Sequence, residues 1–267
     1  MLKARVITAL ILVAMLAAIL FAAPPIVVVI AFSLIAALAA WEWGGLMRQE
    51  PPARWLFALL TLLFCWQMYL IAENVFPLLF IASLVLWLLI MPMWLYQRWT
   101  LAGNDFVGYF VGLLVILPTW AAMVSLQAVS SWLLLAAMAV VWVADVAAYF
   151  SGRAFGRRKL APQISPGKTW EGVLGAVIGV IVYGSLVVSL TPLGGFVHLS
   201  PIGLAGLLIL LTALSVVGDL FESLLKRHAQ IKDSSQLLPG HGGILDRIDS
   251  LTSTLPFVAA LVILGQR

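Results

Sequence analysis

The chain alternates long apolar runs with short polar stretches along its whole length. A helix needs about 20 mostly apolar residues to cross the hydrocarbon core of a bilayer, within a range of about 17–25. Runs of that length occur about nine times, which predicts an all-α, polytopic integral membrane protein with about nine transmembrane helices. The predicted segments are roughly 6–23, 26–46, 55–72, 75–95, 106–126, 131–150, 170–190, 201–224 and 249–265.

The first apolar segment allows two interpretations. Lys3 and Arg5 precede it, an arrangement that is also typical of a cleaved signal peptide. Its apolar run is long enough to cross a bilayer, which favours a helix that is retained. We therefore count this segment among the spans.

The composition agrees with a lipid environment and indicates one domain. Hydrophobic residues make up 63% of the chain and charged residues only 10%. The single cysteine, Cys65, excludes an intrachain disulfide and a cysteine metal cluster. Without internal repeats or a polar linker, residues 1–267 are predicted to form a single membrane domain. Within it, 1–140 supply helices of less specific sequence, and 141–267 supply the helices and loops with polar chemistry.

The basic residues predict the orientation. With the N-terminus in the cytoplasm, the segments assigned to that side contain every Lys and Arg except the terminal Arg267. A wrong number of helices would scramble this asymmetry, which follows the positive-inside rule. The net charge of +4 is therefore explained by membrane topology, and we expect no nucleic-acid partner.

Four acidic residues lie at membrane depth, where each charge costs about 2.5–3.5 kcal/mol on insertion scales. They are Glu42, Asp145, Asp219 and Glu222. Helical spacing puts the last two on one face with Ser223 and Lys226. This stripe indicates a cation or substrate site, with a structural ion pair to Lys226 as the alternative. Glu42 lies between two tryptophans, so it is either functional or part of an interfacial aromatic belt.

The densest polar block runs from Lys226 to Asp249 and reads KRHAQIKDSSQLLPGHGGILDRID. Glycine-rich turns let the backbone approach a ligand and form anion-binding nests. Basic residues neutralise phosphate oxygens, and carboxylates hold hard cations through oxygen. The block therefore predicts a site for a polyphosphate and Mg²⁺. A solvated connector, the alternative, explains the basic residues but not the aspartates beside His-Gly-Gly.

A second basic loop, SGRAFGRRKLAPQISPGKTWEG, covers 151–172. Its Gly-Lys-Thr is not a P-loop, because Pro162 stands where the first glycine is needed and no strand precedes it. Ser165, Lys168 and Thr169 instead suit a phosphate group at the entry of a helix. Alternatively, the two hydroxyl residues are helix caps and the lysine is a topology signal.

The stretch SLLKRHAQIKDSSQLLPGHGGILDRID, 223–249, resembles the signature of the phosphatidate cytidylyltransferase family, also called CDP-diacylglycerol synthases. The segment 151–172 resembles the second block of that family. The resemblance is sharp over about 145–255. The family usually has a hydroxyl residue and a glycine after the aspartate of the sixth span, whereas Val146 and Ala147 follow Asp145 here.

The resemblance implies an enzyme that converts CTP and phosphatidic acid to CDP-diacylglycerol and pyrophosphate and requires Mg²⁺. It also implies a multi-pass protein of a bacterial-type inner membrane, commonly a homodimer, that works in phospholipid biosynthesis. We expect its active site on the cytoplasmic side.

The residues suggest individual roles in this reaction. We expect Asp219 and Asp246 to be the main metal carboxylates, with Glu222 and Asp249 as further candidates for about two cation sites. We expect the basic side chains of Lys226, Arg227 and Lys232 to hold phosphates. The residues expected to bind substrate also include Asp145, Ser165, Lys168, Thr169, Ser223, His241, Gly242, Gly243 and Arg247.

Two other functional classes remain open at this stage. Intramembrane carboxylates and glycine-broken helices also occur in ion-coupled transporters. Against a transporter, the carboxylates gather at one membrane face and no inverted repeat is apparent. Another CTP-using lipid enzyme, such as a polyprenol kinase, is the second alternative.

Overall fold

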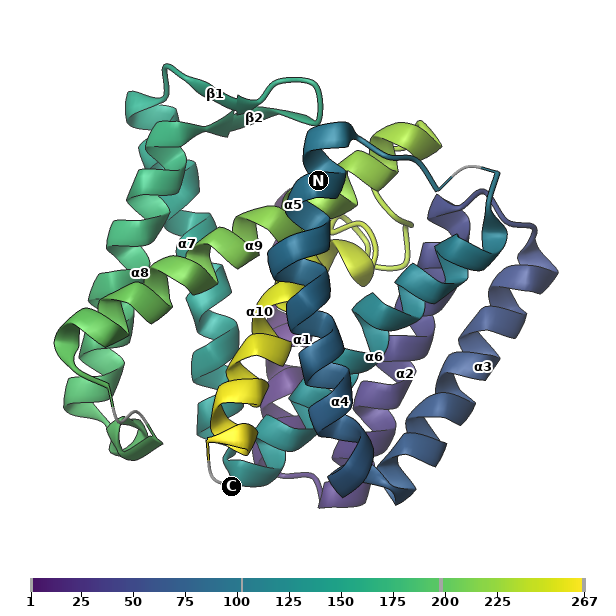
Figure 1. Cartoon of the computed structure of the whole chain (residues 1–267), viewed down its shortest axis with the longest axis horizontal. Coiled ribbons are helices and arrows are strands. Elements are labelled where there is room, and N and C mark those ends of the chain that lie inside the picture. The colour runs from purple at the N-terminus through teal and green to yellow at the C-terminus, as the bar shows by residue number, and fades with distance from the viewer. Residues whose placement is uncertain (1, 102, 197–198, 266–267) are drawn as a thin grey trace.

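The computed structural model describes residues 2–101, 103–196 and 199–265. The chain folds into a bundle of long helices that carries a small two-stranded hairpin at one end (Figure 1). The hairpin and the C-terminal end of α10 lie at opposite ends of the bundle (Figure 1).

The first half of the bundle comprises α1 (Leu2–Phe21), α2 (Pro25–Leu46), α3 (Pro51–Leu70), α4 (Ala72–Val85), the π-helix η1 (Leu86–Ile90), α5 (Met91–Gln97) and α6 (Asp105–Val129). The second half comprises α7 (Ser131–Phe155), β1 (Lys159–Ala161), β2 (Ser165–Thr169), α8 (Trp170–Leu190), the 3₁₀-helix η2 (Pro192–Phe196), α9 (Pro201–Ala229) and α10 (Leu245–Leu264).

The prediction of a polytopic all-α membrane protein is confirmed. Within the described part of the chain, seven helical segments are long and apolar enough to cross a membrane, and they correspond to the second to eighth predicted spans. The first and last predicted spans are also helical, in α1 and α10. The apolar stretch found in α1, Ile7–Phe21, is shorter than the other spans. The exact number of spans and the cytoplasmic N-terminus stay predictions.

The helices begin where the sequence supplies a cap or a proline. Pro25 and Pro51 occupy first-turn positions, where the missing N–H costs nothing. Asn104 accepts a hydrogen bond from the amide of Val107, and Ser200 does the same for Gly203. These local signals explain why most predicted boundaries lie close to the observed ones.

The fourth predicted span is interrupted by the π-helix η1. Pro92, the second residue of α5, has no N–H to donate to the preceding turn, which favours a locally wider helix. The hairpin β1–β2 was not predicted either. Its strands are antiparallel, three and five residues long, and pair Lys159 with Thr169 and Ala161 with Ser165.

Contacts between distant loops gather the polar segments at the hairpin end of the bundle. The Thr8 hydroxyl donates to the carbonyl of Pro239 at 3.1 Å, and Arg48 donates to the carbonyl of His228 at 2.8 Å. Arg98 also contacts Gln163 in the hairpin turn. These contacts bring segments that are far apart in the sequence together at one end of the bundle.

Aromatic packing fixes α9 in the bundle. The Phe221 ring is 2% exposed and lies 5.8 Å from Trp87, 5.9 Å from Trp94 and 6.2 Å from Trp43, measured between ring centroids. Rings at these separations pack favourably beyond the area that they bury. Because Phe221 faces these tryptophans, the acidic residues beside it on α9 face α10 and the hairpin instead.

Candidate active site

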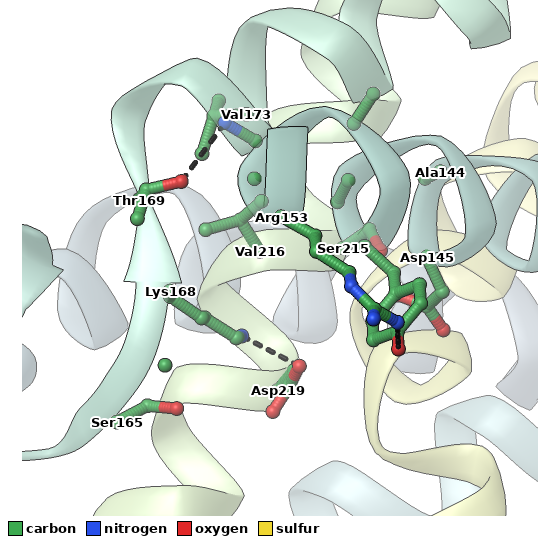
Figure 2. A pocket seen from close by; sticks show the side chains of 16 residues that line it. Ala144, Asp145, Arg153, Ser165, Lys168, Thr169, Val173, Ser215, Val216 and Asp219 are labelled. Carbon is green, nitrogen blue, oxygen red and sulfur yellow. Dashed lines mark hydrogen bonds and ion pairs between the residues drawn. The ribbon is translucent and has the colours of Figure 1, made fainter. Parts of the chain in front are cut away.

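A cavity of about 530 Å³ opens between α7, β2, α8 and α9, and we call it the hairpin cavity. Its polar lining includes Asp145 and Arg153 of α7, Ser165 and Lys168 of β2, and Asp219 of α9 (Figure 2). The rest of its wall is mostly small or apolar. The apolar side chains are Ala144, Ala148, Val173, Ala176 and Val216.

An ion pair crosses the hairpin cavity. The Nζ of Lys168 lies 2.5 Å from Oδ2 of Asp219, and the Ser223 hydroxyl donates to Oδ1 of the same carboxylate at 3.2 Å. About a quarter of the Lys168 side chain and 30% of the Asp219 side chain are exposed. Both groups can therefore still reach a ligand that enters the cavity.

A second cavity, of about 730 Å³, lies in the loop between α9 and α10. We call residues 230–244 the signature loop and this space the loop cavity. Gly240 and Gly242 have φ angles of +77° and +78°, a left-handed conformation that glycine adopts without strain. The lining comprises Lys232, Asp233, Ser235, Gln236, Leu238, Pro239, Gly240, His241, Gly242 and Arg247. In the described part of the chain, the buried Nδ1 of His241 has no hydrogen-bond partner.

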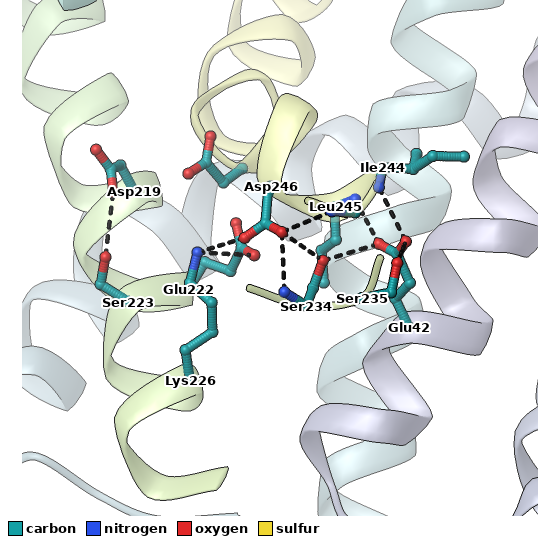
Figure 3. Close-up of polar contacts among 12 residues, drawn as sticks. Glu42, Asp219, Glu222, Ser223, Lys226, Ser234, Ser235, Ile244, Leu245 and Asp246 are labelled. Atoms are coloured by element: carbon teal, nitrogen blue, oxygen red, sulfur yellow. Dashed lines mark hydrogen bonds and ion pairs between the residues drawn. The ribbon is translucent and has the colours of Figure 1, made fainter. Parts of the chain in front are cut away.

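A polar cluster lies where α9 meets the start of α10 (Figure 3). The Nζ of Lys226 donates to Oδ1 of Asp246 at 2.6 Å and lies 3.3 Å from Oε1 of Glu222. The other Asp246 oxygen accepts from the amide and hydroxyl of Ser234 and from the amide of Gly243, at 2.8–2.9 Å.

Asp246 precedes the predicted span 249–265. Burial raises the pKa of its carboxyl, but hydrogen bonds from Lys226, Gly243 and Ser234 outweigh that effect. The pKa therefore lies below its usual value, and Asp246 carries its negative charge at neutral pH.

The two cavities are electrostatically connected. Arg247 lines the loop cavity, and its charge acts on Asp145 in the hairpin cavity. Asp249 interacts with Asp219 and Asp145 on one side and with Lys226 on the other. Charged groups bound in the two cavities would therefore face a shared set of carboxylates and cations.

The donor set of this region fits Mg²⁺ that is shared with a phosphate. The buried oxygens of Glu222 accept no hydrogen bond in the described part of the chain, but the Lys226 ammonium lies 3.3 Å from Oε1, so a cation would bind there in place of Lys226. No three His, Cys, Asp or Glu side chains among the described residues are grouped closely enough to enclose a metal by themselves. Mg²⁺ is usually held by one or two carboxylates together with water and substrate phosphates, so the arrangement suits it.

The two carboxylates expected to be the main metal ligands differ in availability. Asp219 is partly exposed in the hairpin cavity. The Asp246 oxygens already accept hydrogen bonds from Lys226, Ser234 and Gly243, so this group reaches a cation only after Lys226 has moved. Within the described residues no hydrogen bond or ion pair joins Asp219 to Asp246. Asp249 interacts with Asp219 and with Lys226, the partner of Asp246.

Three of the predicted site residues have structural contacts instead of, or besides, a place in a cavity. Arg227 donates to the carbonyl of Ile164 at 3.1 Å and ties α9 to the hairpin turn. The Thr169 hydroxyl caps α8 by accepting from the amide of Gly172 at 3.1 Å, while also lining the hairpin cavity. Gly243 packs behind the loop, where an added Cβ would lie 2.5 Å from Glu42.

Sequence reasoning missed Ser234, Ser235 and Arg153, and it left Glu42 undecided. Glu42 has no exposed surface and binds the signature loop, as described below. The aromatic-belt interpretation is wrong for its neighbour Trp43, which is 1% exposed and donates to the carbonyl of Gly108. The charge of Glu42 inside an apolar helix was the only sequence signal available.

Comparison with known proteins agrees with this geometry. Residues 3–264 match the cytidylyltransferase family. A protein of Pseudomonas aeruginosa named phosphatidate cytidylyltransferase is 40% identical over 273 residues, covering 98% of this chain and 97% of the relative. The protein of that name from Haemophilus influenzae is 37% identical over 288 residues, covering 96% and 97%. The Bacillus subtilis protein of that name is 44% identical over 131 residues, covering 48% and 46%. The chain therefore belongs to the cytidylyltransferase family, and with it to the nucleotidyltransferase enzymes of lipid biosynthesis.

Proposed function

We propose that this protein is a phosphatidate cytidylyltransferase, which joins CTP to phosphatidic acid and releases pyrophosphate. The names of two relatives that match almost the whole chain support this proposal. One structural observation carries it further. A cavity between membrane helices and a cavity in a polar loop each hold charged side chains, and the charge of Arg247 in the loop cavity acts on Asp145 in the hairpin cavity.

The hairpin cavity suits the lipid substrate. It lies between helices long and apolar enough to span a membrane, so a lipid has direct access to it from the bilayer. Lys168 and Arg153 supply positive charge for the lipid phosphate. The alanine and valine side chains of the wall suit the glycerol backbone and the first methylenes of the acyl chains.

The loop cavity suits the nucleotide. Lys232 and Arg247 bring positive charge to the space, and the glycine turns expose backbone groups. The unpartnered Nδ1 of His241 is available for a hydrogen bond to the base or sugar.

In the proposed reaction, an oxygen of the lipid phosphate attacks the α-phosphorus of CTP. A new P–O bond forms, the bond between the α-phosphorus and the bridging oxygen breaks, and pyrophosphate leaves with its electron pair. No protein nucleophile is needed, because the lipid phosphate already is one. The protein brings two anions together and stabilises the charge that moves to pyrophosphate, a task for Lys226 and Lys168.

We further propose that Mg²⁺ binds at about two sites formed by Asp219, Glu222 and Asp246 with the phosphates of the substrate. When bound, the cations would offset negative charge on the phosphates. CTP is made in the cytoplasm, so the hairpin end of the bundle faces that side in our proposal. We also propose that the protein is a multi-pass protein of a bacterial inner membrane and that it works as a homodimer.

The test is turnover by the purified protein in phosphatidate-containing micelles with labelled CTP and Mg²⁺. We expect a labelled liponucleotide and one pyrophosphate for each. CDP and a phosphorylated alcohol, formed when a polyprenol is supplied, would instead identify a kinase. No nucleotide turnover, together with solute uptake into vesicles, would overturn the proposal in favour of a transporter.

A further inference from the structure

Glu42 of α2 is a buried carboxylate whose hydrogen bonds, among the described residues, all come from residues 234–245. Its side chain has no exposed area, and its two oxygens accept four hydrogen bonds (Figure 3). Oε1 accepts from the Ser235 hydroxyl at 2.6 Å and from the Ile244 amide at 2.9 Å. Oε2 accepts from the Leu245 amide at 2.6 Å and from the Ser234 hydroxyl at 3.0 Å.

A carboxylate buried this deeply is stable only when hydrogen bonds replace its water. Four donors on two oxygens meet that requirement. The guanidinium of Arg54, stacked 3.7 Å over the ring of Trp41, adds a charge that acts on Glu42. The loop donors thus stabilise the buried charge of Glu42, and Glu42 in turn stabilises the conformation of the loop.

Glu42 also caps α10 from another helix. Ile244 stands at the N-cap position, where its side chain accepts no hydrogen bond. The first amides of a helix need acceptors, and a negative charge is favoured there. Glu42 accepts from two of these amides, and Asp246 accepts from that of Gly243. The direction of the first turn of α10, which carries Asp246, therefore depends on α2.

Ser234 links Glu42 to the charged cluster. Its hydroxyl lies 3.0 Å from Oε2 of Glu42 and 2.9 Å from Oδ2 of Asp246. Gly243 closes the arrangement, because an added Cβ would lie 2.1 Å from Oγ of Ser234 and 2.6 Å from the second Glu42 oxygen. One carboxylate thereby binds two serine hydroxyls in the signature loop and two backbone amides at the start of α10.

We propose that Glu42 is a positioning residue that holds the signature loop and Asp246 in place for the nucleotide. It lies behind the loop and touches no cavity that the nucleotide would enter. Its hydrogen bonds go to the signature loop and the start of α10, so its influence is strongest at the loop cavity. The kinetic part of this inference rests on the proposed function, whereas the structural part does not.

The structural test is hydrogen exchange of the detergent-solubilised wild type and of Glu42→Gln. In either orientation the NH₂ group of glutamine faces one backbone N–H, which loses its acceptor, and one serine hydroxyl, which has to reverse and accept. We expect peptides covering 230–245 to exchange about 10- to 100-fold faster, with α7 and α8 unchanged. Unchanged exchange in the loop would overturn the proposal. Faster exchange throughout the chain would overturn it as well, because Glu42 would then support the whole fold.

The kinetic test compares the two substrates. Glu42→Gln should raise KM for CTP about tenfold or more and change KM for phosphatidate less than about twofold. Glu42→Asp keeps the charge and should lie between the wild type and Glu42→Gln. Glu50→Gln, the same change at an exposed site of the same bundle end, is the matched control and should match the wild type. Equal increases for both substrates contradict a positioning role at the loop.

A milder variant keeps the proposal testable if Glu42→Gln does not fold. Ser235→Ala removes one donor and should give smaller changes of the same kind in loop exchange and KM for CTP. Where both variants fold, the double variant should show a smaller effect than the sum of the two single ones. Additive effects, or no effect of Ser235→Ala, overturn the proposal. If the wild type forms no liponucleotide, the proposed function is refuted. The hydrogen-exchange experiment still decides whether Glu42 holds the signature loop in place.

Discussion

The walls of the hairpin cavity and the loop cavity differ in secondary structure and in polarity. The hairpin cavity is enclosed by regular helices of the membrane bundle and one short strand, and most of its wall is apolar. The loop cavity is formed by irregular backbone with two left-handed glycines and mostly polar side chains. One cavity owes its shape to helix packing, and the other owes it to hydrogen bonds that reach α2.

This difference matches the two substrates of the proposed reaction. A lipid that arrives from the bilayer needs an opening between rigid, apolar helices. A nucleotide that arrives from water needs donors and flexible backbone. In our proposal the charged cluster of Lys226, Glu222 and Asp246 acts on both substrates. Substitutions should therefore sort into those that affect one substrate and those that affect both.

The largest effect is expected for Asp246→Asn, in the shared cluster. The asparagine cannot accept all the hydrogen bonds from Lys226, Ser234 and Gly243, and Lys226 loses its closest counter-charge. Removing one partner of a buried charge pair costs about 2–5 kcal/mol, so we expect turnover to fall about 10²–10³-fold. Initial rates with both substrates at saturation measure this loss, and an unchanged elution profile in detergent shows that the protein is folded. Near-normal rates would remove Asp246 from the mechanism.

A smaller effect, confined to the nucleotide, is expected for Gly243→Ala. Its methyl group would overlap Ser234 and Glu42, at a cost of about 1–3 kcal/mol for overpacking. We expect kcat/KM for CTP to fall by about one to two orders of magnitude, since 1.4 kcal/mol corresponds to a factor of about ten. Gly206→Ala on α9 is the control, because nothing lies within 4 Å of the added carbon. Equal losses in the two variants would show that the loop is not tightly packed.

Lys168→Met should affect the lipid instead. The change removes the charge that pairs with Asp219 in the hairpin cavity but keeps an unbranched side chain. Hydrogen bonds to charged groups contribute about 1.5–3 kcal/mol, so KM for phosphatidate should rise about tenfold or more. KM for CTP serves as the internal control and should stay near its wild-type value. An increase in KM for CTP alone would exchange the roles of the two cavities.

The smallest effect is expected for Lys232→Met in the loop cavity. Lys232 is exposed, and exposed charge pairs contribute about 0.2–1 kcal/mol. KM for CTP should rise about two- to fivefold at low ionic strength. The difference from the wild type should shrink in added salt, because screening weakens exposed charges. A difference that does not depend on salt would indicate a buried contact instead.

The sequence predicts those features that depend on local spacing. The predicted span 170–190 coincides with α8. Thr169 caps the start of the helix, and the apolar run ends at Leu190, where the helix ends. The shared face of Asp219, Glu222, Ser223 and Lys226 follows from helical periodicity. The observed contacts between Asp219 and Ser223, and between Glu222 and Lys226, confirm it.

Features that depend on tertiary contacts could not be predicted from the sequence. The hairpin strands are short and polar and show no clear alternation, so nothing marked them as strands. The attachment of Arg227 to the hairpin turn depends on how two distant loops meet. The same holds for the partners of Glu42, because periodicity identifies the helix of a buried charge but not what it binds.

The contact between Glu42 and the signature loop has a consequence for biosynthesis. Its partner Ser234 follows 192 residues later in the chain. At about 5–20 residues per second, the ribosome needs on the order of tens of seconds to supply it. Throughout that interval the newly inserted second helix carries a carboxylate without its final partners. Nascent chains released before the last helix should thus be substrates for membrane quality-control proteases.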